Sequence, residues 1–413
     1  MTYTLTEKDI EFLRSIPQAV ETKGKLSELD HVVAAMLVAL LSDGHILLES
    51  NPGLGKTALV KALSNALGLG PSSVGRIQFT PDLMPSDITG TLMPDEVDPQ
   101  RLTFKKGPIF SEILLADEIN RATPKTQAAM LEAMAEFRVT VLGQTYELRH
   151  PNDLDPRGVK QVLNPFMVLA TQNPIDQDGT FDLPEAQLDR FMFKVKLELP
   201  SADTLDKIVE KELSNTAAEY SKPRPAVSAS EEQDETEARL ETLKRLENAR
   251  RGIMSAKLPE AVSVHIINIV MATNGRFDQV RYLSSKRQSA LNAMVAGRVE
   301  YPLGTRAAIS LAKATLGWAA VVEADPSRPD EFPFESVAAL ARVVCPVLRH
   351  RIRIDHEMSD TDYSPAHETQ RLDDYLKELA AAAAPDLAVG NDLAGYHLRF
   401  KAKLDATREM GHL

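Results

Sequence analysis

Short, unbroken apolar runs recur in the first half of the chain, and each is followed at once by polar residues. The clearest are residues 46–48, 113–116 and 166–170. Runs of this length predict central parallel strands that are buried on both faces. Between them, apolar residues such as Leu59 and Leu63 recur at helical spacing. The pattern therefore predicts an α/β fold in which a parallel sheet lies between layers of helices.

Two helices are predicted before the first strand. Residues 5–23 are expected to form the first helix, because Thr6 and Asp9 have the spacing of a capping box. Residues 30–41 are apolar on nearly every side of a helix, which predicts a buried helix that ends before the strand at Gly44.

Two hairpins are predicted after the first strand. Residues 91–104 and residues 138–148 each place a turn between two short arms with apolar residues. We expect the first of them to be an insert that projects from the domain instead of packing on it.

The character of the sequence changes near residue 200, and this change sets the expected domain boundaries. Residues 1–200 are predicted to form an αβα domain with its N-terminal helices and both hairpins. Residues 201–257 are polar and charged, which indicates a linker or helical insertion. Residues 258–354 predict a small all-helical domain.

Residues 355–413 are predicted to form a helical C-terminal tail. Within it we expect an exposed helix over residues 365–384, which are rich in Ala and Glu, and a second helix after Gly395. Exposed helices in a tail would be available to a partner.

The segment SNPGLGKT, residues 50–57, joins the first predicted strand to the next helix. Gly53 and Gly55 lack a Cβ, so the backbone can wrap closely around a phosphate and point its N–H groups at the anion. Lys56 can reach the β- and γ-phosphates of ATP, and Thr57 offers a hydroxyl oxygen to Mg²⁺. These features are typical of a Walker A phosphate loop.

Ser50 stands where the Walker A pattern has its first glycine, which puts the tightness of nucleotide binding in question. An ordinary Gly/Pro turn with a chance lysine is the alternative interpretation of this segment by itself. The residues that we expect to contact the nucleotide are Asn51, Pro52, Gly53, Leu54, Gly55, Lys56, Thr57 and Ala58.

The second predicted strand ends in the acidic pair Asp117 and Glu118. At the carboxyl end of a central parallel strand, Asp117 can support Mg²⁺ together with Thr57. Glu118 can then activate or orient the water that attacks the γ-phosphate. An acidic pair in this position can also be a helix cap or a solvated turn, but the phosphate loop upstream favours the hydrolytic site.

Two more polar residues follow the third predicted strand. Asn173 should emerge at the same sheet edge, where its amide can hydrogen-bond the γ-phosphate or the attacking water. Arg190 lies in an acidic segment further on, and its spacing also allows a simple pairing with Asp189.

Composition restricts the classes of partner. The 413 residues carry a formal net charge of -12, which argues against a mainly electrostatic grip on nucleic acid or anionic lipid. The longest apolar run, residues 32–41, is shorter than the ~20 residues of a membrane span, and the N-terminus lacks the order of a signal peptide. Cys345 is the only cysteine and has apolar neighbours, which predicts a buried structural residue. We therefore expect a cytoplasmic protein with no nucleic-acid partner.

Four segments together resemble one known family. They are NPGLGKT, FTPDLMPSDITG, GPIFSEILLADEINRATPKTQAAMLEAMAE and ATQNPIDQDGTFDLPEAQLDRF, and they fall within residues 46–199. In these segments the chain resembles the MoxR family of AAA+ ATPases, in the clade that carries a hairpin insert in helix 2. The resemblance implies an αβα P-loop NTPase domain followed by an all-helical lid, with ATP and Mg²⁺ as cofactors.

By the same resemblance, Asn173 is similar to sensor 1 and Arg190 to the arginine finger that a neighbouring ring subunit supplies. Arg306 matches sensor 2 by position, at the start of a helix that would point back towards the nucleotide. Arg287 and Arg298 are the alternatives for an arginine of this kind. The predicted catalytic set is therefore Glu118, Asn173, Arg190 and Arg306.

The resemblance also implies a mechanical output. ATP hydrolysis in a hexameric ring would remodel or mature a protein client, alongside a partner with a von Willebrand factor A domain. The two hairpins are similar to elements that family members direct towards the ring's pore or partner face. A motor subunit of a metal chelatase and a nucleotide-gated scaffold that hydrolyses ATP poorly are the alternative interpretations, and a nucleic-acid motor ranks third.

Overall fold

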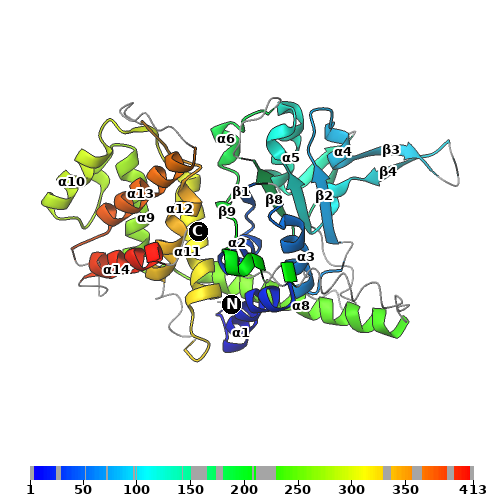
Figure 1. Cartoon of the computed structure of the whole chain (residues 1–413), viewed down its shortest axis with the longest axis horizontal. Coiled ribbons are helices and arrows are strands. Elements are labelled where there is room, and N and C mark those ends of the chain that lie inside the picture. Colours follow the sequence, from blue (N-terminus) through cyan, green and yellow to red (C-terminus); the bar gives the residue numbers. More distant parts are fainter. Residues whose placement is uncertain are drawn as a thin grey trace.

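The structure is a computed structural model in which a central sheet lies between a helical domain and a projecting hairpin (Figure 1). It describes residues 4–24, 29–51, 53–70, 73–95, 98, 100–141, 143–149, 165–173, 180–206, 209–210, 229–328, 336–355, 365–387 and 395–409.

The central sheet has five strands, all parallel, in the order β2-β5-β8-β1-β9. Their bounds are β1 (Ile46–Ser50), β2 (Val74–Gln78), β5 (Ile113–Asp117), β8 (Met167–Gln172) and β9 (Phe193–Leu197). The three predicted apolar runs form β1, β5 and β8, the three inner strands, because only inner strands are covered on both faces. The predicted α/β class is confirmed.

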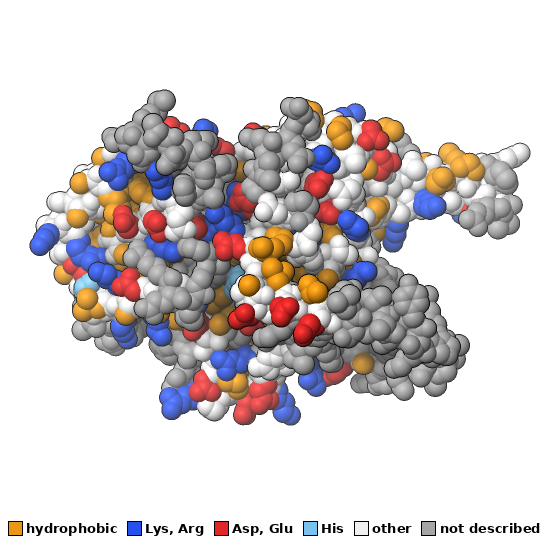
Figure 2. All heavy atoms as spheres, viewed as in Figure 1, with side chains coloured by type: hydrophobic (Ala, Val, Ile, Leu, Met, Phe, Trp, Pro, Cys, Tyr) orange, Lys and Arg blue, Asp and Glu red, His pale blue; other side chains and the backbone are white. Residues whose placement is uncertain are grey.

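Two hairpins and a short strand pair stand outside the sheet. The hairpins are β3 (Gly90–Pro94) with β4 (Leu102–Lys106) and β6 (Arg138–Val141) with β7 (Gln144–Glu147), and the pair is β10 (Val299–Tyr301) with β11 (Arg353–Ile354). The β3–β4 hairpin extends away from the rest of the molecule (Figure 1). Met93 and Leu102 on it are exposed apolar residues, and Figure 2 shows apolar side chains gathered there.

Helices cover both faces of the sheet. The helices of the first domain are α1 (Glu7–Gly24), α2 (Asp30–Leu41), α3 (Lys56–Ala66), α4 (Pro85–Thr89), α5 (Pro124–Glu136), α6 (Glu185–Leu188) and α8 (Ala229–Ser255). Alternate strand residues enter two separate cores: Ile46 and Leu48 pack with α1, α2 and α3, whereas Leu47 packs with α4 and α5. This alternation follows from the two-residue period of a strand.

The helical domain shares a core with one face of the sheet. Its helices are α9 (Glu260–Thr273), α10 (Ser285–Val295), α11 (Thr305–Trp318), α12 (Ser336–Leu348), α13 (Pro365–Ala383) and α14 (Tyr396–Glu409). Gly317 of α11 lies so close to α2 that a Cβ there would stand 2.7 Å from Val38. The apolar side chains of α11 and α2 therefore belong to the same buried cluster as those of the sheet.

The prediction of exposed helices in the C-terminal tail is wrong. In α13, Leu376, Leu379 and Ala380 are fully buried, and in α14 Tyr396 and Phe400 are buried. Both helices pack on α12 and complete the helical domain. The Ala-rich composition of α13 allowed close packing, which a count of charged residues does not reveal.

The turn between α2 and β1 contains a residue with a positive φ. The helix ends at Leu41, as expected, but Asp43 and not Gly44 takes the left-handed conformation, with φ 56°. Gly44 is needed for another reason: a Cβ there would lie 2.8 Å from the Cβ of Met192. The glycine therefore permits close approach of the segment that precedes β9.

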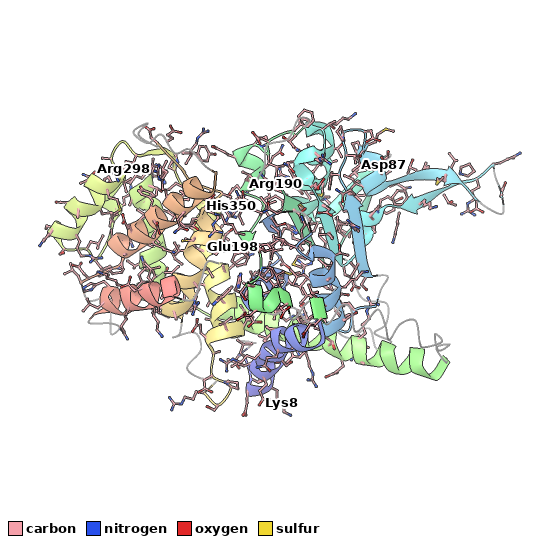
Figure 3. All side chains as sticks on the ribbon, in the orientation of Figure 1. Lys8, Asp87, Arg190, Glu198, Arg298 and His350 are labelled. Carbon is pink, nitrogen blue, oxygen red and sulfur yellow. The ribbon has the colours of Figure 1, made fainter. Side chains whose placement is uncertain are left out.

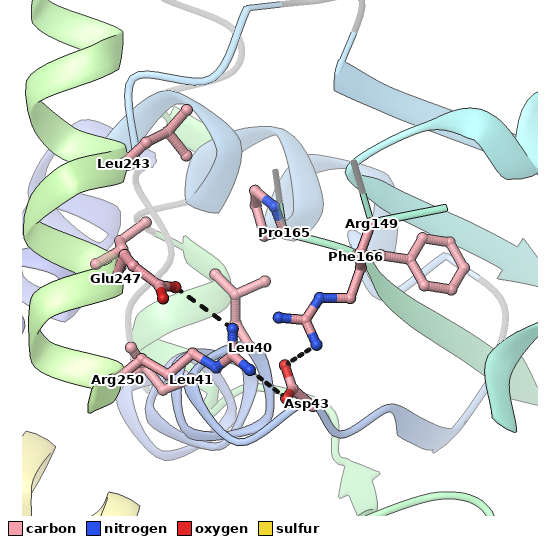
Figure 4. Close-up of a pocket in the computed structure, with 10 residues that line it drawn as sticks. Leu40, Leu41, Asp43, Arg149, Pro165, Phe166, Leu243, Glu247 and Arg250 are labelled. Atoms are coloured by element: carbon pink, nitrogen blue, oxygen red, sulfur yellow. Dashed lines mark hydrogen bonds and ion pairs between the residues drawn. The ribbon is translucent and has the colours of Figure 1, made fainter. Parts of the chain in front are cut away.

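Asp43 is held by two arginines from distant segments (Figure 4). Arg149, which follows β7, and Arg250 of α8 each contact one oxygen of its carboxylate. The pocket around them has a volume of about 30 Å³, room for little more than a water molecule. This junction therefore joins α8 to the sheet domain instead of forming a ligand site, and it supports the strained backbone of Asp43.

A buried histidine fastens the last helix. The two ring nitrogens of His265 in α9 lie 2.8 Å from the carbonyl oxygen of Ala380 and 3.0 Å from the hydroxyl of Tyr396. Burial lowers the pKa of His265 to about 4. The ring is therefore neutral, and one nitrogen donates to Ala380 while the other accepts from Tyr396.

The chain's only cysteine lies in α12. Cys345 is buried, and burial raises the pKa of its thiol to about 12, so the prediction of a structural cysteine is confirmed.

Within the described ranges, no single helix is long and apolar enough to cross a membrane. One pair of helices, bent by 78°, is long and apolar enough only when the two are taken together.

We predict that replacing Asp43 with Ala will lower the midpoint of thermal unfolding, because two partly buried guanidinium groups lose a carboxylate partner and only Arg250 keeps another, Glu247. The expected cost is roughly 1–3 kcal/mol. Asp43→Asn should cost less, since Asn tolerates the left-handed conformation and keeps one acceptor oxygen. Glu241→Ala, which breaks an exposed pair with Arg245, is the control and should leave the midpoint unchanged. Equal midpoints for Asp43→Ala and Glu241→Ala would contradict the proposed role of the junction.

We predict that stability falls as the pH is lowered from 6.5 towards 4. The pKa of His265 is about 4 in the folded chain against an ordinary value of 6.5, so the unfolded chain binds the extra proton in this window. Stability from this group is complete above pH 6.5, and its loss reaches about 3 kcal/mol at the acid end. Unfolding midpoints measured from pH 7.5 to 5 test the expectation. His265→Leu should be less stable at every pH but should show a flatter pH dependence; an unchanged slope would refute it.

Candidate nucleotide-binding site

The phosphate loop lies between β1 and α3, at the carboxyl edge of the sheet. Gly53 and Gly55 take left-handed conformations with φ 87° and 73°, and no atom lies within 4 Å of the position of an added Cβ. The loop is therefore open towards solvent, with a backbone that only glycine adopts readily. Gly55 precedes the first helical residue, Lys56, so the free N–H groups of α3 point towards the loop.

The other loop residues occupy defined places, except Pro52, which lies outside the described residues. Thr57 and Ala58 are in the first turn of α3, and Asn51 and Leu54 lie in the loop before it. Ser50 is the last residue of β1 and pairs with Leu197 of β9. Its backbone is that of a strand, a conformation that a residue with a side chain adopts readily.

Asp117 lies at the end of β5 and is surrounded by groups that favour its charged form. Its Oδ1 is 3.7 Å from the Nζ of Lys56 and accepts a hydrogen bond of 2.7 Å from the hydroxyl of Thr171. Its Oδ2 accepts from Arg76 at 3.0 Å. Burial by itself would raise the pKa of Asp117, but the bonds from Thr171 and Arg76 and the charge of Lys56 hold that pKa below its ordinary value. The carboxylate is therefore ionised at neutral pH.

Glu118 follows with a backbone conformation that is rare for a residue with a side chain, φ 58°. Its N–H donates to the hydroxyl of Thr171 at 2.9 Å, which fixes the turn. Its carboxylate accepts from Gln78 at 3.1 Å and from Arg121 at 3.2 Å. The carboxylates of Asp117 and Glu118 therefore accept hydrogen bonds from different side chains.

Four of these partners were missed by sequence reasoning: Arg76, Gln78, Arg121 and Thr171. The sequence did contain a signal for Thr171. It is a hydroxyl residue near the end of an apolar strand, and the preceding apolar strand ends in the acidic pair. Arg76 and Gln78 are two residues apart on β2, and their relation to the acidic pair depends on β2 being the neighbour of β5. Strand order of this kind is not written in the sequence.

Asn173 directly follows β8, next to β5 in the sheet. Its carbonyl oxygen is 3.5 Å from the side-chain amide of Asn120, which follows Glu118 by two residues. The phosphate loop, the acidic pair and Asn173 thus follow three adjacent strands at one edge, as the sequence predicted.

The donor groups at this edge fit Mg²⁺. They are one hydroxyl oxygen, from Thr57, and one carboxylate, from Asp117, and the contact of Lys56 with Asp117 shows that the first turn of α3 lies beside the end of β5. Mg²⁺ takes few protein oxygens and fills its sphere with phosphate oxygens and water. Among the described residues no cluster of three or more His, Cys, Asp or Glu side chains is found. The site therefore fits a metal ion that arrives with a nucleotide.

A second cluster lies at the opposite, amino edge of the sheet. Here an open pocket is lined by residues that precede β1, by the segment before β9 and by α11, and it contains Asp189, Arg190, Arg306, Lys313 and Arg351. Figure 3 shows Arg190 and His350 at the junction of the two domains. The cluster is rich in arginine, which is suited to binding a polyphosphate.

Asp189 organises this cluster. Its carboxylate accepts from the Nε of Arg351 at 2.8 Å and lies 3.6 Å from Arg306. Arg190, next in sequence, donates to the carbonyl oxygen of Leu131 in α5. The side chain of Arg351 is buried, whereas that of Arg306 is 60% exposed. Asp189 therefore pairs with Arg306 and Arg351. It does not pair with Arg190, although the spacing in the sequence allowed that pairing.

The position of Arg306 differs from the expectation that it points back to the nucleotide of its own chain. The five residues of β1 separate the pocket from the phosphate loop, a span of roughly 15 Å. α11 packs on α2 at the amino edge, where Lys313 donates to Ser42, and so carries Arg306 away from the phosphate loop. The alternative Arg287 has a structural task, since it donates to carbonyl oxygens at the end of α13. Arg298 lies beside Asp355 through a backbone hydrogen bond.

Comparison with known proteins agrees with this geometry. Residues 45–193 match the model of the ATPase family associated with various cellular activities (AAA). The chain is 49% identical over 165 residues to the uncharacterized protein YeaC of Bacillus subtilis, covering 40% of this chain and 46% of that protein. It is 41% identical over 189 residues to chaperone MoxR1 of Mycobacterium tuberculosis, covering 46% and 45%.

A crystal structure of a protein assigned as an ATPase, from Cytophaga hutchinsonii, superposes with a TM-score of 0.62 at 28% identity. The superposition covers 89% of this chain and 96% of the Cytophaga hutchinsonii chain, so the similarity includes the helical domain. The chain spans about half the length of the curated relatives that it matches. The phosphate loop, the acidic pair and the five-stranded parallel sheet agree with the match of residues 45–193 to the AAA ATPase family, and in this region the chain is similar to chaperone MoxR1.

Proposed function

We propose that this chain hydrolyses ATP in a ring of identical subunits, a hexamer, with each active site completed by the neighbouring subunit. The observation that carries the proposal is the separation of two half-sites within one chain. The phosphate loop and acidic pair lie at the carboxyl edge of the sheet, and the arginines lie at the amino edge. A ring in which the amino edge of one subunit faces the carboxyl edge of the next would bring the halves together.

Each residue has a role in this proposal. Lys56 and the backbone N–H groups of the loop would hold the phosphates, and Thr57 and Asp117 would hold Mg²⁺, which neutralises charge on the phosphates when bound. Glu118 would accept a hydrogen bond from the attacking water and draw its proton, with Asn173 orienting the same water.

The neighbour's contribution is positive charge. Arg190 and Arg306 of one subunit would stabilise the charge that develops on the γ-phosphate held by the next subunit. Arg306 is thus proposed to act across the boundary along with Arg190, because both lie in the pocket at the amino edge.

We further propose that hydrolysis remodels or matures a protein client in the cytoplasm, alongside a partner with a von Willebrand factor A domain. The exposed Met93 and Leu102 on the projecting hairpin support contact with another protein. A chelatase motor subunit and a weakly hydrolysing scaffold remain the alternatives. Turnover by the purified chain tests the scaffold, which would bind ATP with little turnover in every mixture, and the candidate partner that raises turnover distinguishes a chelatase motor from the proposed function.

Substitution of Lys56 and substitution of Glu118 are expected to remove different properties of the protein. Lys56→Ala should abolish nucleotide binding, because it removes the cation that holds the phosphates. Glu118→Gln should keep binding and lose hydrolysis, because it spares the loop. Binding of a fluorescent ATP analogue and release of phosphate measure the two properties. Equal loss of binding in both variants would contradict the assigned roles.

Complementation between variants tests the shared site. Arg190→Ala and Glu118→Gln should each be nearly inactive as uniform rings, with a loss of ~10³ to 10⁵ in turnover for the arginine. Mixed rings should regain activity, because some interfaces join an intact Glu118 to a neighbour's intact Arg190. The same experiment with Arg306→Ala decides whether Arg306 acts across the boundary, since an arginine that served its own nucleotide could not be replaced by a neighbour.

The matched control is a mixture of Lys56→Ala with Glu118→Gln. Both defects lie in the same half-site, so no interface in that mixture is complete and activity should stay absent. Mass measurement must show that mixed rings form. Formation of mixed rings without any return of activity would overturn the shared site, provided that mixtures of each variant with wild-type protein remain active.

A further inference from the structure

Arg76 is an additional cation at the phosphate site, and neither the sequence motifs nor the proposed mechanism assign it a task. It lies on β2, the edge strand, in register with Leu115 of β5. Its guanidinium reaches across to the Oδ2 of Asp117 at 3.0 Å, while 54% of the side chain stays exposed. The pair therefore joins a flexible, accessible arginine to a carboxylate that is almost buried.

The two oxygens of Asp117 have different surroundings. Oδ1 is occupied by the hydroxyl of Thr171, and Lys56 lies nearby. Oδ2 has Arg76 as its partner. A hard cation that binds Asp117, directly or through a bound water, needs an oxygen lone pair that no other cation occupies. Thr171 lies deep in the sheet and cannot leave, whereas the exposed Arg76 can.

Arg76 is also connected to the neighbouring acidic residue. Its guanidinium lies 3.4 Å from the amide oxygen of Gln78, and the amide nitrogen of Gln78 donates to Glu118. The two residues of β2 thus contact both acidic residues, Arg76 on Asp117 at the end of β5 and Gln78 on Glu118 directly after it. Movement of Arg76 would leave Gln78 and Glu118 in contact.

We propose that Arg76 takes the place of the metal ion on Asp117 while the site is empty, and that Mg²⁺ arriving with the nucleotide displaces it. The pair neutralises a carboxylate that would otherwise be partly buried with a single cation near it. Arg76 therefore raises the concentration of Mg²⁺ that nucleotide binding requires. This inference rests on the proposed function, since it takes Asp117 to be the support of Mg²⁺.

The test measures the binding of a fluorescent ATP analogue while free Mg²⁺ is varied, and it needs no turnover. Arg76→Gln should reduce the half-saturating Mg²⁺ concentration about two- to fivefold, the effect expected for removing an exposed ion pair. In the presence of a chelator, Arg76→Gln should not increase the affinity for the analogue, because no metal ion is present to bind the carboxylate of Asp117.

Arg121→Gln is the matched control for charge. It removes the same charge from the same sheet edge, but Arg121 contacts Glu118 and leaves the pair of Arg76 and Asp117 in place. Its half-saturating Mg²⁺ concentration should stay close to that of the wild-type chain. If Arg121→Gln lowers that concentration as much as Arg76→Gln does, the effect is one of general charge and the exchange is refuted.

Two further outcomes separate this inference from the proposed function. An unchanged or increased Mg²⁺ requirement in Arg76→Gln, in a protein that does bind the analogue, would refute the exchange and leave the ATPase proposal intact. Failure of the wild-type chain to bind the analogue at any Mg²⁺ concentration, with Lys56→Ala behaving identically, would refute both.

Discussion

Every strand of the central sheet runs in the same direction, and this constraint places all the chemistry of the chain. Whatever follows a strand meets at one edge, and whatever precedes a strand meets at the other. The phosphate loop, the acidic pair and Asn173 follow β1, β5 and β8, so they share the carboxyl edge. The segment with Arg190 precedes β9 and shares the other edge with the turn before β1. A parallel sheet therefore separates the acidic pair from the pocket with Arg190 by the length of a strand.

The position of the helical domain depends on a few contacts at the amino edge. Arg349, His350 and Arg351 lie in succession after α12, and all three contact backbone carbonyls of the segment 191–194. His350 is buried, and burial lowers its pKa well below the ordinary value, so it acts as a neutral hydrogen-bonding group. These contacts fasten the helical domain to the start of β9. The arginines of α11 and of the segment before β9 are thereby held in one pocket.

Charge at the carboxyl edge is balanced before any ligand is present. Asp117 and Glu118 have different cations as partners. Thr171 connects the two residues, because it donates to the carboxylate of Asp117 and accepts from the N–H of Glu118, and Arg76 with Gln78 forms a second connection. Carboxylates that are partly buried need such partners to remain ionised. The hydrogen-bond donors to Asp117 come from β2 and β8, so the lowered pKa of Asp117 depends on strand order.

The sequence by itself determined the class of fold, the inner strands and the residues of the phosphate loop and acidic pair, because these depend on local patterns. Apolar runs of strand length and a glycine-rich turn are read within about ten residues. The tertiary structure alone decided the burial of α13 and α14, the strained turn at Asp43 and the partners of Asp117. It also decided that Arg306 lies with Arg190 and not with Lys56. Each of these depends on contacts between segments tens to hundreds of residues apart, and no local pattern specifies which distant segment will be the neighbour.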